Sequence, residues 1–215
     1  TDAPVLGSLI NPRTREENLF EAEFLELQPM LEQALAQELK DDNVHEMAVT
    51  ARGLAKTANL LTGQFTLVST NVPYLGRGKQ NVVLKEYCEA VFPESKADLA
   101  TCFVERCLDF CSPHGASALV TPHQWLFLNT YKHLRRTLIR RMEWNMVARL
   151  DENAFDSPQA AGAFVGLFVF SQDRPRADAD FVGIECSDLP APDAKAQGLI
   201  ASTLRSISQF WQLNN

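Results

Sequence analysis

The chain has 215 residues, enough to bury one substantial core or most of one domain of a larger enzyme. Hydrophobic residues make up 46% of it, as in ordinary globular proteins, and the longest apolar run is only about half as long as a bilayer span. Five cysteines without paired spacing, and no charged-then-apolar leader, argue against a disulfide-rich secreted domain or a membrane protein. We therefore expect a cytoplasmic protein with reduced thiols.

The net charge of −7 is unevenly distributed along the chain. Residues 1–70 carry five Lys/Arg against eleven Asp/Glu, and residues 150–215 carry four against nine. Residues 71–149 carry eleven Lys/Arg against seven Asp/Glu. This positive excess favours a phosphate-facing surface in the middle of the chain, although an ordinary solvated face gives the same count.

The first part of the chain predicts helices that alternate with strands. Apolar residues recur at steps of three and four over residues 20–39 and 47–61, which is typical of amphipathic helices. Gly63 ends this pattern, and residues 65–69 read as a buried strand. Because a helix, a glycine and a strand form half of a βαβ unit, we expect a parallel sheet. The pattern then predicts a helix over 99–110, a strand over 116–121 and a helix over 125–142.

The last part of the chain predicts a hairpin and a closing helix. Residues 144–150 and 163–170 are apolar runs joined by a polar loop around Asp156-Ser157-Pro158. Since this connection is too short for a crossover helix, we expect an antiparallel pair at the edge of the sheet. A strand over 181–186, a linker over 187–194 and an amphipathic helix over 200–211 follow.

The tetrapeptide Asn71-Val72-Pro73-Tyr74 stands at the C-terminal end of the first predicted strand. The amide of Asn71 and the backbone carbonyl of Val72 can each accept a hydrogen bond from an exocyclic amine. The ring of Tyr74 can stack on the heterocycle that carries this amine. The pattern predicts a site for a flat base, but Asn71 as a simple turn residue and Tyr74 as a core residue remain alternatives.

The tetrapeptide resembles motif IV, Asn-Pro-Pro-Tyr, of the adenine-N6-specific DNA methyltransferases. Val72 replaces the usual proline, which keeps the carbonyl acceptor and loses only backbone rigidity. In order and spacing, residues 54–170 are similar to the large methyltransferases of BREX-type phage-exclusion systems and to fused type II restriction–modification enzymes. The segments that carry this similarity are 70–80, 84–85, 96–100, 103–106, 118–122 and 124–128.

The resemblance implies an α/β fold, namely the C-terminal, catalytic half of a Rossmann-like methyltransferase sheet with flanking helices. It divides the chain into a helical lead-in over 1–62, the catalytic half over 63–186, and a linker with a C-terminal helix over 187–215. The implied activity moves a methyl group from S-adenosylmethionine to the N6 amine of adenine in double-stranded DNA. Its setting would be a restriction–modification or phage-defence system.

The resemblance also gives roles to single residues. All four residues of the tetrapeptide, from Asn71 through Val72 and Pro73 to Tyr74, would be catalytic, and Asn71 and Pro73 would also contact the methyl donor. Tyr74 would stack on an adenine flipped out of the duplex.

Three further residues are candidate DNA contacts. Phe155 would be a second aromatic against the flipped base, although a core phenylalanine is the alternative. Arg77 and Lys79, next to the tetrapeptide, are candidate phosphate contacts.

Other patterns carry weaker functional hypotheses. Lys132, Arg136 and Arg140 share one helical face, for which a solvated outer surface is favoured over phosphate contact. The run of residues 76–79 lacks the spacing and the Ser/Thr of a phosphate-binding P-loop. Three cysteines at helical spacing without a histidine in register indicate core thiols rather than zinc ligands, so no metal site is expected. They are Cys102, Cys107 and Cys111.

Two parts of a complete methyltransferase are not found in the sequence. The glycines before Asn71 are only Gly7, Gly53 and Gly63, too scattered for the cofactor-binding loop. The 45 residues after Phe170 are too few for a target-recognition domain. We therefore expect a piece of a larger enzyme, with most of the cofactor site supplied by further segments or a partner chain. A degenerate interaction module and an unrelated α/β nucleic-acid-binding domain are the alternatives.

Overall fold

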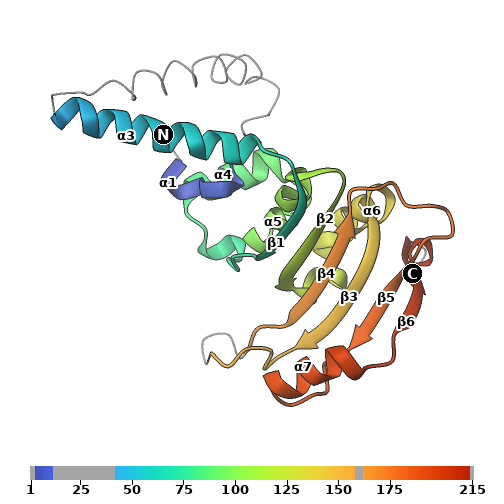
Figure 1. Cartoon of the computed structure of the whole chain (residues 1–215). Coiled ribbons are helices and arrows are strands. Elements are labelled where there is room, and N and C mark those ends of the chain that lie inside the picture. The colour runs from blue at the N-terminus through green and yellow to red at the C-terminus, as the bar shows by residue number, and fades with distance from the viewer. Residues whose placement is uncertain (1–2, 12–41, 158–161, 214–215) are drawn as a thin grey trace. The chain divides into compact units, whose positions relative to one another are not determined.

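The computed structural model describes residues 3–11, 42–157 and 162–213, in two compact units (Figure 1). The N-terminal unit, Thr1–Gly63, contains α1 (Ala3–Leu6), the 3-10 turn η1 (Gly7–Leu9) and the long helix α3 (Asp42–Thr62). Helix α3 contains the helix predicted over residues 47–61. The helix predicted over residues 20–39 lies outside the described residues.

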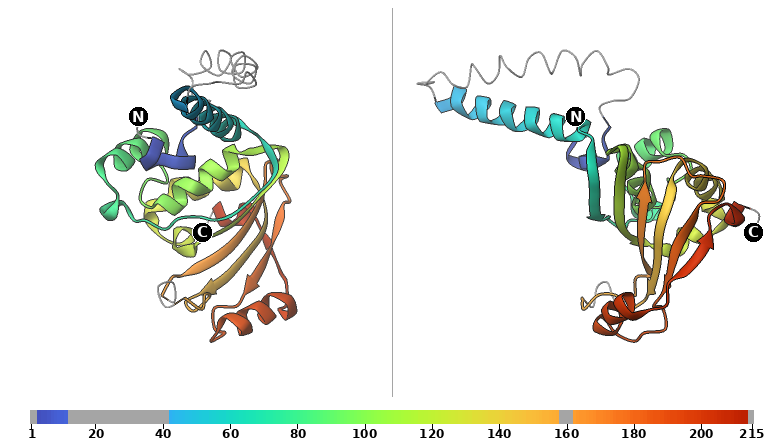
Figure 2. Two further views of the ribbon diagram at one scale, coloured as in Figure 1. Left: turned by 60° about the vertical axis from the view of Figure 1, so that its left-hand side comes forward. Right: turned by 45° about the vertical axis from the view of Figure 1, so that its right-hand side comes forward.

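The C-terminal unit, Gln64–Asn215, is built on a six-stranded mixed sheet (Figure 2). The strand order is β1-β2-β4-β3-β5-β6. The strands are β1 (Phe65–Asn71), β2 (Cys111–Pro122), β3 (Glu143–Asp151), β4 (Val165–Ser171), β5 (Asp180–Glu185) and β6 (Arg205–Ser208). Strand β1 pairs parallel with β2, and β3 pairs parallel with β5, whereas β4 and β6 run the other way. The predicted α/β fold and the expected parallel pairing are confirmed.

This topology gathers four strand ends. Because β1, β2, β3 and β5 run in one direction, their C-terminal residues meet at the same edge of the sheet, which we call the carboxyl edge. The residues that end these strands there are Asn71, Pro122, Asp151 and Glu185. Polar groups that are far apart in the sequence are therefore placed along one line.

The predicted hairpin is antiparallel, as expected, but its place in the sheet differs. Strand β4 inserts between β2 and β3 and pairs with both, so the hairpin lies in the middle of the sheet and not at its edge. The physical reason is burial, since Phe168 and Phe170 are 1% and 0% exposed and no residue of β4 is fully exposed, as is usual for a strand in the interior of a sheet. The edge strands are β1 and β6.

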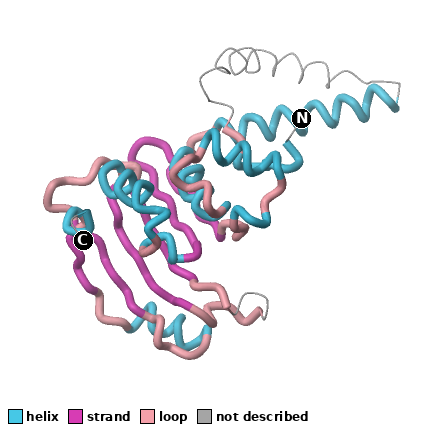
Figure 3. Tube along the Cα trace, turned by 180° about the vertical axis from the view of Figure 1, so that it is seen from behind, coloured by secondary structure: helices cyan, strands magenta, loops and turns pink. Residues whose placement is uncertain are grey.

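Helices pack on one face of this sheet (Figure 3). The main core joins the strands to α5 (Leu99–Asp109) and α6 (Lys132–Arg141), and α4 (Val82–Val91) precedes them. The helix predicted over 125–142 begins with two 3-10 turns, η3 (His123–Leu126) and η4 (Asn129–Tyr131), because the backbone is extended at Leu128 between them. Within the described ranges no helix has the length and apolarity to cross a bilayer.

The C-terminal prediction is wrong in its details. Helix α7 (Pro192–Ala201) begins inside the predicted linker, where Pro192 occupies the first turn, and it ends where the backbone of Ser202 becomes extended. Residues that were expected to continue a helix form β6 and the 3-10 turn η5 (Phe210–Leu213). The free edge of β5 explains the change, since it hydrogen-bonds β6 and lets Ile207 pack on the core.

Candidate active site

The tetrapeptide lies at the carboxyl edge, directly at the end of β1. Asn71 is the last residue of this strand and stands opposite Val120 of β2. Its side chain is exposed, and no residue in the described ranges hydrogen-bonds its amide. The amide is therefore presented at the edge where a ligand of an α/β sheet binds.

Val72 fixes the backbone that follows. Its side chain is 3% exposed in the main core, and its N–H donates a hydrogen bond of 3.2 Å to the carbonyl oxygen of Val120. The buried side chain and the ladder hydrogen bond hold the peptide unit next to Asn71. Val72 thus anchors the backbone of the tetrapeptide to β2 and to the core.

The loop after the tetrapeptide is tied to the start of α5. Asp98, the N-cap of α5, accepts hydrogen bonds from the N–H groups of Ala100, at 2.8 Å, and Leu75, at 3.3 Å. The N–H of Leu99 donates in return to the carbonyl of Leu75, at 3.0 Å. One capping carboxylate therefore holds both a helix and the candidate catalytic loop.

Tyr74 packs inward in this structure. Its ring lies against the main core, and its hydroxyl is buried without a hydrogen-bond partner among the described residues. Burial, with a further contribution from Asp98, raises the pKa of Tyr74 to about 12, so the phenol is neutral at physiological pH. The residue as a whole is only partly buried.

The two candidate phosphate contacts have different environments on the turn η2 (Arg77–Lys79). Arg77 pairs with Glu89 of α4 at 2.8 Å, while Glu89 also binds Lys96 at 2.7 Å. These cations lower the pKa of Glu89, and the hydrogen bond from Lys96 contributes most. Lys79 is exposed at the surface, so it is the better placed of the two to meet a phosphate.

Phe155 lies in the connection that follows β3, and so at the carboxyl edge as well. It is half-buried and packs on a second apolar cluster that includes Leu150 and Val165. Three strand spacings separate β1 from β3, which amounts to about 14 Å along the edge. The structure brings Phe155 to the same edge of the sheet as Asn71.

A charged cluster at the carboxyl edge was not predicted from the sequence. Nε2 of the buried His123 lies 3.0 Å from a carboxylate oxygen of Asp151, and Arg149 bridges Asp151 and Glu185 at 3.1 Å each. Burial lowers the pKa of His123. The signal in the sequence was available, since these residues stand at or next to the ends of three predicted strands.

A buried lysine secures the same edge from the side of α7. Lys195 is 2% exposed, and its ammonium group donates to the carbonyls of Leu150, of Cys186 at 3.0 Å and of Ser187 at 3.2 Å. These carbonyls lie at the ends of β3 and β5. Lys195 therefore joins two strand ends that bracket the charged cluster.

The cysteines lie in the core, as expected. All five are buried and free, and Cys102, Cys107 and Cys111 contribute to the packing around α5 and β2. The basic side chains of Lys132, Arg136 and Arg140 are exposed on α6, which agrees with a solvated surface and with a phosphate contact alike.

The described part of the chain lacks one element of a Rossmann-like cofactor site. In the described part that precedes Asn71 there are helices and β1, but no strand–turn–helix unit with clustered glycines that could hold the adenosine half.

Comparison with known proteins decides the family. The profile of the Eco57I restriction-modification methylases matches residues 9–155, which is more than half of the chain. The chain belongs to the Eco57I restriction-modification methylase family. The resemblance to adenine-specific DNA methyltransferases predicted from the sequence is confirmed.

Two curated relatives of this Eco57I-family chain are much longer proteins. The adenine-specific methyltransferase PglX of Lacticaseibacillus casei (strain Zhang) is 33% identical over 155 residues, covering 70% of this chain and 12% of PglX. The adenine-specific methyltransferase BrxX of Escherichia coli O9:H4 (strain HS) is 31% identical over 155 residues, covering 72% of this chain and 12% of BrxX. The chain thus spans about one eighth of the length of these relatives.

Solved structures show the fold of the family. A nuclease-deletion mutant of the Type ISP restriction-modification enzyme LlaGI, in complex with a DNA substrate mimic, is 12% identical at a TM-score of 0.51, over 83% of this chain and 20% of LlaGI. DrdV in complex with DNA is 13% identical at a TM-score of 0.51, over 74% of this chain and 18% of DrdV. The Rossmann-like fold expected from the sequence is confirmed.

Proposed function

We propose that this chain carries the catalytic strand of an adenine-N6-specific DNA methyltransferase of a restriction–modification or phage-defence system. The observation that carries the proposal is the exposed amide of Asn71 at the carboxyl edge, followed by a backbone that Val72 and Asp98 hold in place. Membership of the Eco57I family and the names of the relatives PglX and BrxX support it.

The chemistry explains why an amide and a carbonyl are suited to this reaction. The exocyclic amine of adenine is a poor nucleophile, since its lone pair is delocalised into the ring. Acceptors at Asn71 Oδ1 and the carbonyl of Val72 favour a pyramidal nitrogen as the methyl group arrives. This stabilisation grows toward the transition state, and the proton can leave afterwards.

The DNA-facing residues follow from the same geometry. An N6 amine cannot react inside the base stack, so the adenine has to be flipped out of double-stranded DNA. Tyr74 would then stack on the flipped base, with Phe155 as a second aromatic contact. Lys79, and Arg77 once released from Glu89, would contact phosphates. Solved neighbours such as LlaGI and DrdV are themselves bound to DNA or a DNA mimic.

The methyl donor implied by the family is S-adenosylmethionine, which supplies an electrophilic methyl group. Asn71 and Pro73 would orient the reacting centre next to the methyl group. The rest of the cofactor site would come from segments outside this chain or from a partner chain, because the residues described here do not provide it.

A direct test is to identify the product of the full-length parent enzyme. Unmethylated DNA is incubated with the enzyme and isotopically labelled S-adenosylmethionine, digested to nucleosides and separated by liquid chromatography with mass detection. The proposal expects the label in N6-methyldeoxyadenosine. Label found only in a methylated cytosine, or no label in DNA under conditions where the enzyme binds DNA, contradicts it.

A further inference from the structure

His123 contacts both ends of the connection that joins β3 to β4. It directly follows β2 and is 4% exposed. Its Nε2 lies 3.0 Å from a carboxylate oxygen of Asp151, the last residue of β3. Its Nδ1 lies 3.3 Å from the carbonyl oxygen of Val165, the first residue of β4, and its backbone N–H donates to the carbonyl of Phe164 at 2.8 Å. One residue from a third strand end therefore joins the two strands that bound this connection.

The two ring nitrogens of His123 both face acceptors. Burial lowers the pKa of His123, so the ring is neutral at physiological pH and carries a proton on one nitrogen only. A carboxylate accepts a hydrogen bond more strongly than a neutral carbonyl does, and the contact to Asp151 is the shorter of the two. The proton therefore belongs on Nε2, and the bond from Nε2–H to Asp151 is the main interaction of the ring.

Asp151 is the residue at which the chain leaves the sheet. Its φ is +56°, in the left-handed region, and Asn153 has a φ of +59° two residues later. Aspartate and asparagine adopt this region more often than other residues with a Cβ, but they hold it only where the surrounding structure fixes them. Here His123 and Arg149 bind the two oxygens of the carboxylate, at 3.0 and 3.1 Å. The direction in which the connection leaves β3 therefore depends on the side chain of Asp151.

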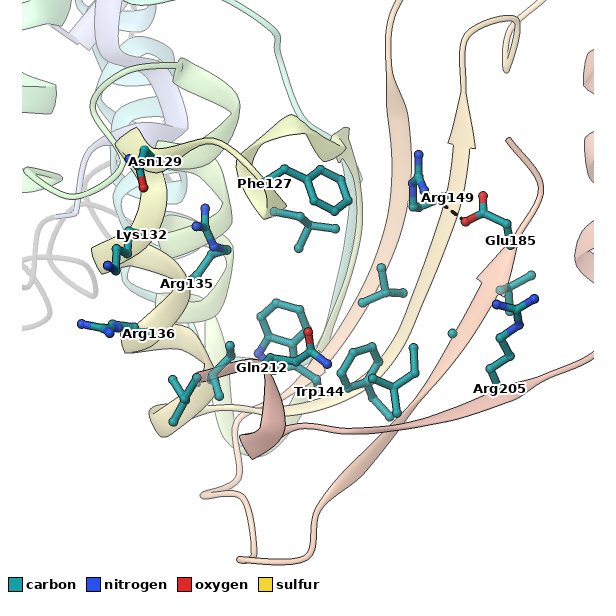
Figure 4. Close-up of a pocket in the computed structure, with 18 residues that line it drawn as sticks. Phe127, Asn129, Lys132, Arg135, Arg136, Trp144, Arg149, Glu185, Arg205 and Gln212 are labelled. Atoms are coloured by element: carbon teal, nitrogen blue, oxygen red, sulfur yellow. Dashed lines mark hydrogen bonds and ion pairs between the residues drawn. The ribbon is translucent and has the colours of Figure 1, made fainter. Parts of the chain in front are cut away.

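The partners of Asp151 are themselves fixed. Arg149 also pairs with Glu185 of β5 at 3.1 Å (Figure 4). Both of these side chains line a groove between α6 and the strands β3, β5 and β6. On the other side of Asp151, a Cβ added to Gly166 of β4 would lie 2.9 Å from the Cβ of His123. His123 is therefore packed directly against β4, which leaves its ring little freedom to move away from Asp151.

The position of Phe155 depends on the strand ends that His123 joins. Phe155 follows Asp151 by four residues and packs on the apolar cluster that contains Leu150 and Val165. Leu150 precedes Asp151 in β3, and Val165 is the residue whose carbonyl oxygen faces Nδ1 of His123. Two members of this cluster thus belong to the ends of β3 and β4. A change at His123 is therefore expected to reach Phe155.

We propose that His123 is a positioning residue for the methylation reaction, and that it fixes Phe155 through Asp151 without contacting DNA or the methyl donor. This role rests on the proposed function, in which Phe155 is the second aromatic contact of a flipped adenine. All the contacts that carry it lie inside the C-terminal unit. A histidine with a merely structural role would affect stability, but its effect on the reaction would be independent of Phe155.

The test is a double-mutant cycle in the full-length parent enzyme, measured as kcat for the transfer of labelled methyl groups to saturating unmethylated DNA. Phe155→Ala removes the ring. His123→Asn places its amide where Nδ1 stands, so the donor to Asp151 is lost. Each variant is expected to lower kcat about tenfold, the size of one lost contact between a base and an aromatic ring. If His123 acts through Phe155, kcat of the double variant should stay within about twofold of kcat of Phe155→Ala.

Two further histidine variants provide a rescue and a control. His123→Gln places its amide where Nε2 stands, keeps the donor to Asp151 and is expected to restore most of kcat. His114→Asn removes another contact between a histidine and an aspartate, Asp173, near the start of β2 and so at the opposite edge of the sheet. The φ of His114 is +63°, which asparagine tolerates, so kcat should be unchanged.

If His123→Asn does not melt cooperatively, Asp151→Asn replaces it in the cycle. Asparagine also tolerates the positive φ of this position, but it offers one acceptor oxygen in place of the two that His123 and Arg149 bind. The expectation is the same, namely a lower kcat that is not lowered further by Phe155→Ala.

The outcomes separate this role of His123 from the proposed function. If the unmodified enzyme does not methylate N6 of adenine, the proposed function is wrong and the role of His123 falls with it. If it does, three results overturn the role of His123 alone. They are full activity of His123→Asn, an equal loss in His123→Gln and His123→Asn, or losses that multiply in the double variant. Full activity of Phe155→Ala overturns it as well, because Phe155 is the residue through which His123 would act.

Discussion

The hydroxyl of Tyr74 is buried beside the carboxylate of Asp98 and has no hydrogen-bond partner in the described part of the chain. A buried hydroxyl without a partner is destabilising, and the nearby negative charge adds to the cost of ionising it. This inward position of Tyr74 is therefore held by ring packing alone.

Tyr74→Phe is expected to leave the stability of the chain unchanged or to raise it, because it removes an unpartnered hydroxyl and keeps the ring. Tyr131 provides the matched control, since it is also buried but its hydroxyl bonds to Thr101. Tyr131→Phe should cost about 1 kcal/mol. Urea denaturation of both variants checks this pair. A clear loss of stability in Tyr74→Phe would mean that the hydroxyl of Tyr74 has a hydrogen-bond partner.

Asp98→Ala is expected to lower both stability and activity. Loss of the N-cap costs about 1 kcal/mol, and the loop at Leu75 loses its anchor to α5. Asn81→Ala is the control, because Asn81 caps α4 by accepting from Leu84 N–H at 2.9 Å without touching the tetrapeptide. Both variants should melt earlier, but only Asp98→Ala should reduce methylation by the full-length enzyme. If the Asp98→Ala and Asn81→Ala enzymes were equally stable and equally active, the hydrogen bond from Leu75 to Asp98 would not be needed for catalysis.

Val72→Pro is expected to keep methyltransferase activity in the full-length enzyme, since the backbone carbonyl stays in place. The variant loses the N–H that donates to Val120, so its free energy of unfolding should fall by about 1 kcal/mol. Asn71 tolerates a following proline, because a strand residue already has the extended backbone that proline requires. Complete inactivation of a folded Val72→Pro enzyme would show that the side chain or N–H of Val72 is needed.

Glu105 predicts a pH dependence of stability. Burial raises the pKa of this carboxyl, although Ser95 donates a hydrogen bond to it. The folded state therefore holds the proton more tightly than the unfolded state, so the favourable contribution is present below the unfolded pKa and is lost as pH rises through the folded pKa. Glutamine stays neutral at every pH. The free energy of unfolding of Glu105→Gln should therefore exceed that of the unmodified chain at pH 7, and this difference should be smaller at pH 4.

Glu89 is the control, because Lys96 and Arg77 lower its pKa, whereas the pKa of Glu105 is raised. Glu89→Gln should lose stability at pH 7, and this loss should shrink as the solution is acidified. Urea denaturation of the three proteins at both pH values provides the comparison. Parallel pH profiles for Glu105→Gln and the unmodified chain would mean that Glu105 is not perturbed.

The sequence predicts the parts of the fold that local patterns control. The strand before Asn71, the helix over α5 and the antiparallel pairing of β3 with β4 all follow from apolar spacing and loop length. The insertion of β4 between β2 and β3 does not, since strand order depends on contacts that are remote in sequence. The same holds for β6, whose residues pair with β5 only because that edge is free.

The candidate site shows a similar division. The position of Asn71 at the carboxyl edge follows from the sequence, because a motif after a strand must lie where the strand ends. The inward packing of Tyr74 and the pairing of Arg77 with Glu89 depend on side chains from α4 and the core, which no local pattern reveals. The contact between His123 and Asp151 likewise joins the ends of β2 and β3, which only the sheet brings together.

The central claim is that the amide of Asn71 acts on the amine of adenine, and Asn71→Ala in the full-length enzyme tests it most directly. Loss of one such contact typically costs about 10²–10³ in rate. Asn145→Ala, at an exposed asparagine of β3, is the control. We predict that methylation-sensitive digestion shows a loss of this size for Asn71→Ala alone, with DNA affinity nearly unchanged. More than a tenth of the unmodified activity in Asn71→Ala would contradict the account.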